Sequence, residues 1–422
     1  MIVWRVAALA VFEMRYQSRN PLYRGAIATL FLLAFAAAAS PTLRLGAPGQ
    51  TYINAPRAIA QTELIFGLIY MMVAAALVAG AAARDHESGF APILFSLPVR
   101  EAQYEAGRLL GALAACSAGF LVVPAGIFAS TVSPWVDPQT LGVNHASHYL
   151  FAFAFLCLPV LVSVSAIVFA LANITRSMLG GYLALLALLI LHVAAASGAA
   201  RPELREAAAL FDPFGLATFR NVVRYWTVAQ NNSAMPALQG PVLWGRLLWL
   251  AIAAMLMLLS VRFKGNAVKR ALPNVRQDAL ASSFAAGGMQ RLLPRGRALH
   301  PKALTQLAER TRLELKLVLQ GPAFLVLLLL GIAHAAAALA FGGDLYGTPT
   351  LPLTRDVIPT LIANFAIVPA IVAIYYGGEV VWRERDRRIH EIVGTAPIPS
   401  WALVAPKMLA LGLVLVTMTI LS

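Results

Sequence analysis

The sequence predicts an all-α polytopic membrane protein, and three observations lead to this fold class. Hydrophobic residues make up 59% of the chain and charged residues only 12%, whereas a soluble domain carries about 25% charged residues. The mean hydropathy is +0.73. Apolar stretches close to the ~20 residues that cross a bilayer recur along the chain, and the pattern of the first part is repeated in the second.

Nine apolar stretches are long enough to be candidate membrane spans. Six of them precede a basic stretch, at residues 25–43, 64–83, 109–132, 149–172, 178–196 and 247–261. Three follow it, at residues 324–341, 357–382 and 403–421. We therefore expect about nine transmembrane helices, of which the sixth is the shortest.

The basic residues indicate an orientation for these spans. If the N-terminus is cytoplasmic, 25 of the 33 lysines and arginines fall on the cytoplasmic side, as the positive-inside rule requires. The net charge of +14 is thereby a signal of topology rather than of nucleic-acid binding, which needs a basic face on a soluble module. We expect a multi-pass protein of the inner (plasma) membrane. Both cysteines, Cys116 and Cys157, lie in apolar segments and predict neither a disulfide nor a metal cluster.

An internal repeat organises the chain. Glu13 lies eight residues before Pro21, and Glu314 lies eight residues before Pro322, in each case just ahead of a candidate span. Further matches share one offset of 299 residues: 84–87 with 383–386, Pro98 with Pro397, and Gly107-Arg108 with Pro406-Lys407. These matches predict a first unit at 1–262, a basic cytoplasmic linker at 263–305 and a partial second unit at 306–422. An even number of spans in the first unit makes the repeats parallel, and repeats are common in transporters.

The second copy is shorter than the first. Ser422 corresponds to Val123, which lies inside the third candidate span. A chain that ended there would leave carbonyl groups unsatisfied in hydrocarbon. We therefore expect this sequence to be part of a longer protein.

Two loops, 84–108 and 383–407, carry the sharpest functional pattern. Each opens with alternating acids and bases, and a short amphipathic piece follows, at 90–97 and 389–396. Such a piece can dock on a soluble partner, or the charges can simply anchor the helices and set topology. The recurrence of the pattern in both copies favours docking.

This order of elements resembles the type-two (ABC-2 type) ABC exporter permeases, in which a charged interfacial helix precedes six spans. The resemblance implies one six-helix permease unit plus a truncated copy, and it implies that the loop after the second span contacts a separate ATP-binding subunit. The implied coupling residues are Arg84, Asp85, Glu87 and Pro98, and Arg383, Glu384, Asp386 and Pro397. The implied interfacial helices carry Glu13 and Arg15, and Glu314 and Lys316.

The outer loop before the sixth span carries a narrower resemblance. Asp212-Pro213-Phe214-Gly215 has the composition of a turn, and Tyr225-Trp226 suits a membrane interface. Together with 231–232 and 246–249, these motifs resemble a subgroup in which a duplicated permease unit is fused to a C-terminal gluzincin zinc aminopeptidase. That peptidase would lie beyond residue 422. The alternative interpretation is an ordered cap that contacts no ligand.

No complete motif for hydrolysis occurs in the sequence. His390-Glu391 begins like a zinc-protease helix, but Gly394 stands where the second histidine belongs, and no phosphate-binding Gly-x4-Gly-Lys-Ser/Thr loop is present. His145 and His148 are more typical of a surface pair than of a metal site. We expect no catalytic residue, metal or cofactor in this chain, with ATP and magnesium bound by a partner subunit.

A few polar residues fall within the candidate spans. Glu63 and Glu379 lie near span ends, where we expect them to anchor the helix at the interface. His192, His334 and Asn364 are typical of hydrogen bonding between helices. No run of charges indicates a proton relay.

The sequence therefore predicts the permease subunit of an ATP-driven exporter, with an ATP-binding subunit, membrane lipid and an unknown exported substrate as its partners. Two alternatives stay open: the membrane anchor of a fused aminopeptidase, and a secondary transporter that needs no ATPase.

Overall fold

The computed structural model describes residues 2–40, 47, 49–94, 96, 100–199, 202–262, 303–319 and 400–421, with scattered positions between 324 and 378. The chain divides into two compact units, Met1–Ala267 and Val268–Ser422. The division falls within the segment 263–305 that the sequence predicts as a linker.

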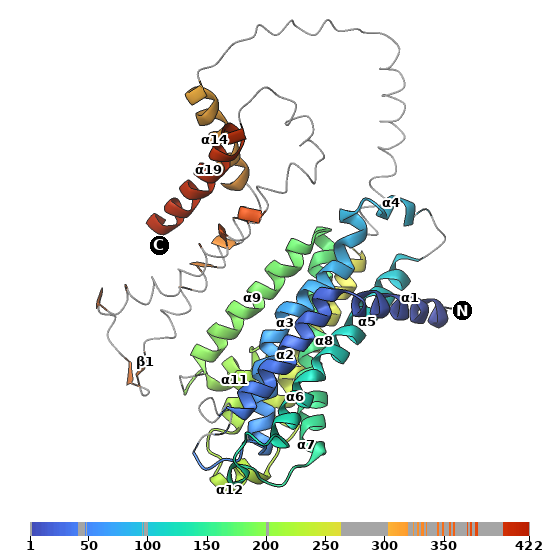
Figure 1. Cartoon of the computed structure of the whole chain (residues 1–422), viewed down its shortest axis with the longest axis vertical. Coiled ribbons are helices and arrows are strands. Elements are labelled where there is room, and N and C mark those ends of the chain that lie inside the picture. The colour runs from blue at the N-terminus through green and yellow to red at the C-terminus, as the bar shows by residue number, and fades with distance from the viewer. Residues whose placement is uncertain are drawn as a thin grey trace, which may run out of the picture. The chain divides into compact units, whose positions relative to one another are not determined.

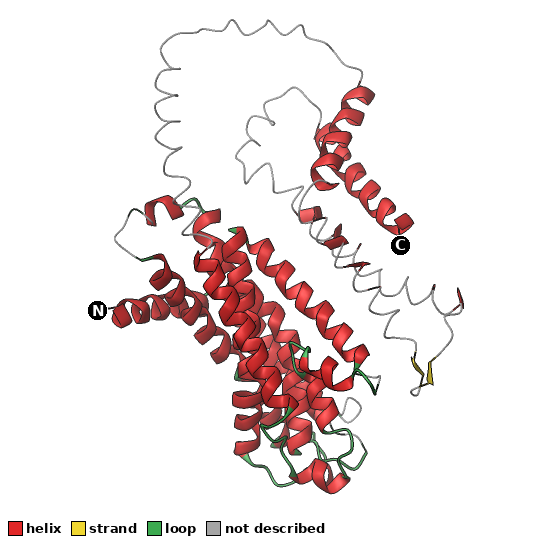
Figure 2. Cartoon of the chain, turned by 180° about the vertical axis from the view of Figure 1, so that it is seen from behind, coloured by secondary structure: helices red, strands yellow, loops and turns green. Residues whose placement is uncertain are grey.

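The described part of the first unit is built from helices (Figures 1 and 2). In chain order these are α1 (Ile2–Ser18), α2 (Pro21–Ala39), α3 (Pro56–Glu87), α4 (Ala91–Leu94), α5 (Glu101–Phe120), α6 (Val122–Thr131), η1 (Pro138–Thr140), α7 (Ala146–Phe151), the π-helical η2 (Ala152–Cys157), α8 (Leu158–Thr175), α9 (Met178–Gly198), α10 (Arg205–Leu210), α11 (Leu216–Val222) and α12 (Val228–Ser233). A last helix, Pro241–Arg262, completes the unit.

Among the residues that the structure describes, six helical segments are long and apolar enough to cross a membrane. They are Pro21–Ala39, Pro56–Glu87, Glu101–Thr131, Ala146–Thr175, Met178–Gly198 and Pro241–Arg262. Each contains most of one predicted stretch of the first copy, which confirms the prediction of a polytopic helical membrane protein. The predicted stretch 247–261 belongs to a helix of 22 residues, so it is not unusually short.

Helix α3 is longer than a bilayer requires. Its 32 residues extend about 48 Å at 1.5 Å per residue, whereas the hydrocarbon core is about 30 Å thick. The end of α3 that carries Arg84 is close to α1, α4 and the start of α5, and we call this end of the unit the Arg84 end. The opposite end, with α11 and α12, is the Asp212 end (Figure 1).

Prolines account for the irregular points in the spans. Pro124 cannot donate a hydrogen bond to Phe120, and helix α5 gives way to α6 there, with Leu121 between them. Pro159 follows the π-helical segment η2, as expected where a missing donor and a ring clash widen the preceding turn. Helix α1 ends at Ser18 and α2 begins at Pro21, and Asn20 caps the new helix by accepting from the Leu22 amide at 2.9 Å. Helix α1 therefore runs across the end of the bundle rather than along it (Figure 1).

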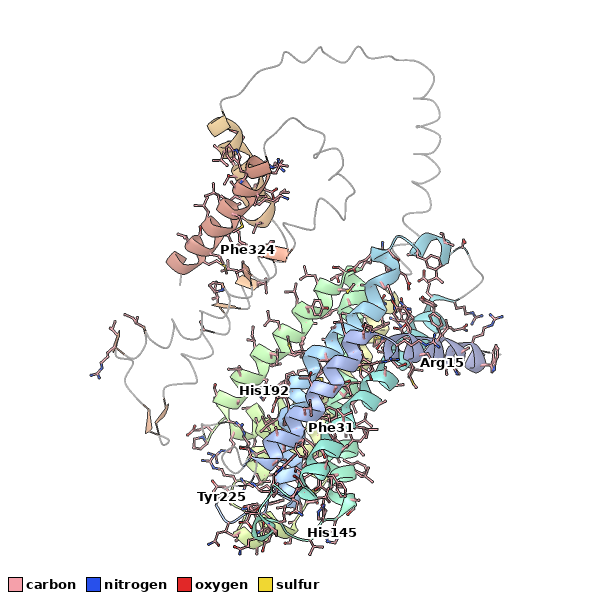
Figure 3. All side chains as sticks on the ribbon, in the orientation of Figure 1. Arg15, Phe31, His145, His192, Tyr225 and Phe324 are labelled. Carbon is pink, nitrogen blue, oxygen red and sulfur yellow. The ribbon has the colours of Figure 1, made fainter. Side chains whose placement is uncertain are left out.

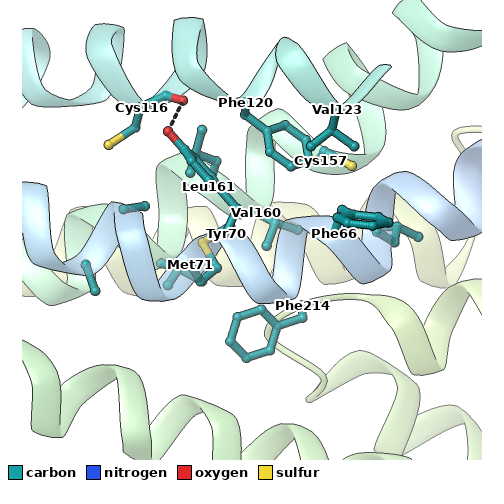
Figure 4. Packing of buried hydrophobic residues seen from close by; sticks show 14 of the residues in the cluster. Phe66, Tyr70, Met71, Cys116, Phe120, Val123, Cys157, Val160, Leu161 and Phe214 are labelled. Atoms are coloured by element: carbon teal, nitrogen blue, oxygen red, sulfur yellow. Dashed lines mark hydrogen bonds between the residues drawn. The ribbon is translucent and has the colours of Figure 1, made fainter. Parts of the chain in front are cut away.

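Helix α3 is the central element of the bundle and packs against α5, α8 and α9. Its side chains Ile59, Tyr70 and Val78 are fully buried. The Tyr70 hydroxyl donates to the Cys116 carbonyl of α5 at 2.9 Å (Figure 4). This bond satisfies a phenol in an apolar interior, where an unpaired hydroxyl is costly.

Helices α14 (Ala303–Leu319) and α19 (Ser400–Leu421) of the second unit pack against each other. Two-residue strands, β1 (Asp344–Leu345) and β2 (Thr348–Pro349), pair antiparallel. The predicted span 403–421 coincides with α19. The predicted spans 324–341 and 357–382 lie mostly outside the described residues, as do Asn364, His334, Glu379 and His390-Glu391.

Candidate functional site: a buried ion network at the Arg84 end

Glu13 of α1 is the centre of a buried ion network. Its side chain is fully buried, and its carboxylate lies 2.8 Å from Arg84 Nη2 of α3 and 2.7 Å from Arg108 Nη1 of α5. Gln17, one turn further along α1, donates to Glu13 Oε1 at 2.8 Å. A buried carboxylate needs such partners because its desolvation is otherwise uncompensated. One side chain thus joins three helices that are far apart in the sequence.

Small residues on α5 let α1 come close enough for these contacts. A Cβ added at Gly107 would lie 2.6 Å from the Leu9 Cβ, and one added at Gly111 would meet the Ala10 carbonyl and the Glu13 Cβ. These two glycines are four residues apart and therefore share a helix face. Their missing side chains allow the backbones of α1 and α5 to approach each other, as small residues do in packed membrane helices.

A second carboxylate extends the network. The Tyr104 hydroxyl donates to Asp85 Oδ2 at 2.8 Å, and Arg108 Nη2 lies 3.3 Å from the same oxygen. The latter contact is close enough for Coulomb attraction but is not aligned as a hydrogen bond. Two arginines and two carboxylates make the network formally neutral, as a buried cluster requires.

The predicted coupling residues of the first copy are engaged inside the unit. Arg84 and Asp85 belong to the network, and the Arg84 guanidinium lies 4.1 Å above the Tyr16 ring. The Glu87 carboxylate accepts from the Met178 amide at 2.8 Å and so caps the start of α9. Pro98 and the whole second set, Arg383, Glu384, Asp386 and Pro397, lie outside the described residues.

The tip of the 84–108 loop presents apolar side chains to solvent. Phe90 is 47% exposed and Ile93 is 61% exposed, and Ile93 belongs to the short helix α4, where the sequence predicts an amphipathic piece. Phe90 and Ile93 are thus exposed, whereas Arg84 and Asp85 are engaged within the unit.

The second unit carries counterparts of this arrangement. Glu314 on α14 is buried, and α14 packs against α19 as α1 packs against α5. Helix α19 holds Lys407, and its residues Pro406 and Ala410 are buried at the positions of Gly107 and Gly111. Lys316, like Arg15, is exposed.

The motif Asp212–Gly215 forms a turn at the Asp212 end. Asp212 Oδ1 accepts from the Phe214 amide at 3.0 Å and Oδ2 from the Ala217 amide at 2.6 Å. His192 Nδ1 of α9 lies 2.7 Å from Asp212 Oδ1. The histidine thus bonds a loop rather than a neighbouring helix.

Two features of the structure favour glycine at position 215 of this motif. Its φ is +71°, which favours a residue without a Cβ, and the Arg246 guanidinium occupies the place of that Cβ. Of the predicted interface pair, Tyr225 is 78% exposed, whereas Trp226 packs against the core. Pro213 and Phe214 lie in the turn, and the Phe214 ring is buried. His192 and Tyr225 are labelled in Figure 3.

Glu63 does not lie where the sequence predicts. Its side chain is fully buried, and within the described part of the chain neither carboxylate oxygen has a hydrogen-bond partner. Anchoring at the interface is therefore wrong for this residue. One turn along the same face of α3, Gly67 lines a cavity of about 10 Å³ together with Cys157 and Phe214, which is room for about one water molecule.

Sequence reasoning missed Arg108, Gln17 and Tyr104 as members of the network. The match of Arg108 with Lys407 in the repeat was the available signal, since it places a positive charge at the same position of both copies. Among the described residues no group of three metal-ligating side chains occurs. No family model and no curated protein matches this sequence.

Proposed function

We propose that this chain is the membrane-spanning permease part of an ATP-driven exporter related to the ABC-2 type. ATP and magnesium belong to separate subunits, which dock on the loops 84–108 and 383–407. The chain lies in the inner (plasma) membrane with its N-terminus and both loops in the cytoplasm, and the second unit adds three spans to the six of the first.

The ion network supports this proposal most directly. A force on the loop tip at Phe90 and Ile93 acts on the ends of α3 and α5. Arg84 lies in the last turn of α3 and Arg108 lies two turns into α5, and both are held by Glu13 of α1. Helices joined by buried charge pairs move together, because breaking one pair leaves a buried charge uncompensated and costs about 3–5 kcal/mol. An ATP-driven movement at the loop would therefore displace α1, α3 and α5 as one body.

The repeat is the second support. A buried acid on α14, packed on a helix that carries Lys407, offers the second loop the same mechanical connection. Two parallel units with two docking loops suit two ATP-binding subunits that close on each other.

The experiment is purification of the full-length gene product from its own membranes in mild detergent, with mass spectrometry of the proteins that accompany it. We expect a stoichiometric ATPase that contains a phosphate-binding loop. If no ATPase is found and the same polypeptide contains a zinc peptidase sequence, the exporter proposal gives way to that of a membrane-anchored aminopeptidase. Ion-coupled uptake without any ATPase would replace it by a secondary transporter.

A further inference from the structure

The face of α1 that the ion network does not use is basic and aromatic. Between residues 2 and 20 the only acidic residue is Glu13, and its carboxylate is paired with Arg84 and Arg108. Trp4, Phe12 and Tyr16 are 76%, 61% and 51% exposed. Aromatic side chains are enriched at the membrane interface, and basic side chains are attracted to anionic headgroups.

A groove is hollowed where α1 turns into α2. It has a volume of about 560 Å³ and is lined by Phe12, Arg15, Tyr16, Arg19, Asn20 and Pro21. This volume falls within the range of about 300–1,000 Å³ that is usual for small-molecule sites. Arg15, which is labelled in Figure 3, lies in the last turn of α1.

The groove carries positive charge that the described residues do not neutralise. Within the described residues, neither Arg15 nor Arg19 forms an ion pair with a carboxylate. The groove also adjoins the first residue of α2, the positive end of a 19-residue helix dipole. The two guanidinium groups provide the positive charge and the hydrogen-bond donors that a phosphate needs.

The aromatic wall of the groove is fixed in position. The Phe12 and Tyr16 rings stack with their centroids 6.4 Å apart, and the Arg84 guanidinium lies over the Tyr16 ring. Since Arg84 is itself held by Glu13, the ion network orients this wall. A preformed site loses less entropy when its ligand binds.

We propose that this groove binds the phosphate headgroup of an anionic phospholipid, with Arg15 and Arg19 on the phosphate and Phe12 and Tyr16 against the glycerol and the first methylenes. A lipid is favoured over a soluble phosphate because the groove lies on an amphipathic helix at the end of the spans and combines its charges with exposed apolar rings. The lipid would thus hold α1, the helix that carries Glu13, at the membrane surface.

The test is lipid binding to the full-length protein in neutral detergent. Short-chain phosphatidylglycerol is titrated against phosphatidylcholine and followed by native mass spectrometry. We expect phosphatidylglycerol to bind more tightly. A basic residue close to an anionic headgroup contributes about 1 kcal/mol, and this effect falls off within a Debye length of about 8–10 Å. One such residue is worth about fivefold in affinity, so the double variant Arg15→Gln/Arg19→Gln should bind about thirtyfold more weakly.

The matched control is Arg5→Gln, on the same helix but outside the groove, which should change the affinity less than twofold. Equal binding of the two lipids, or an unchanged affinity in the double variant, would overturn the proposal. Glycerol phosphate that displaces the lipid at equal concentration would overturn it too, because the ligand would then be a soluble phosphate. No ATP-binding subunit takes part, so the result does not depend on the exporter proposal.

Discussion

Replacing Glu13 with glutamine tests the ion network at its centre. Glutamine keeps the size of the side chain but removes the charge that compensates Arg84 and Arg108. Removing one partner of a buried ion pair costs about 3–5 kcal/mol. We expect the lower end of this range, since Arg84 is 27% exposed and can be rehydrated, and Asp85 lies 3.3 Å from Arg108.

A loss of about 3 kcal/mol corresponds to a decrease of about 6–12 °C in the apparent melting temperature of a unit of this size. The assay is thermal unfolding of the detergent-solubilised protein, followed by intrinsic fluorescence. The control is Arg5→Gln on the same helix, which is exposed and lies outside the ion network, and it should change the stability by less than about 0.5 kcal/mol.

A double variant separates the network from a general effect on α1. Arg108→Met removes the most buried cation, so Glu13→Gln/Arg108→Met should lose less stability than the two single variants together. An unchanged melting temperature for Glu13→Gln, or full additivity in the double variant, would refute the coupling of α1 to α5 through this charge.

Three further substitutions test other features by the same thermal assay. Gly111→Ala should destabilise the protein by about 1–3 kcal/mol through overpacking against α1. The control Gly25→Ala has nothing within 4 Å of the added methyl and should be neutral or stabilising. Equal effects of the two substitutions would contradict the close approach of α1 to α5. Gly215→Ala should cost more than Gly89→Ala, because both have φ near +70° but only Gly215 faces the Arg246 guanidinium; similar losses would remove that explanation. Glu63→Gln should leave the melting temperature unchanged or raise it, since no partner is lost, and a decrease of several degrees would show that the carboxylate has an unrecognised partner.

Much of the fold follows from the sequence, because each span must satisfy its own backbone and bury an apolar length set by the bilayer. The six apolar segments of the first unit could be predicted for this reason. The repeat pointed to Glu13 and Arg84 in one copy and to their counterparts in the other, although it could not show that these residues meet. Contacts between helices depend on how the helices pack side by side. Glu13 and Arg84 are 71 residues apart in the sequence, so their contact cannot be read from local pattern.

Glu63 shows where hydropathy is insufficient. The apolar stretch begins at residue 64, which suggested a position at the interface, but helix α3 begins at Pro56 and the carboxyl lies two turns inside it, among neighbouring helices. The role of Arg84 and Asp85 was open for a similar reason. Alternating charges after a span are expected both for docking and for internal pairing, and only the positions of α1 and α5 distinguish the two.

The most direct test of the exporter proposal is retention of the ATP-binding subunit by variants at the loop tip. Full-length protein carrying Phe90→Asp/Ile93→Asp is purified beside wild type and beside Val143→Asp, a control at the Asp212 end whose side chain is 77% exposed. We predict that the loop-tip variant loses the ATPase while its melting temperature is unchanged, and that the control retains it. Equal retention of the ATPase by all three proteins would contradict docking on the 84–108 loop.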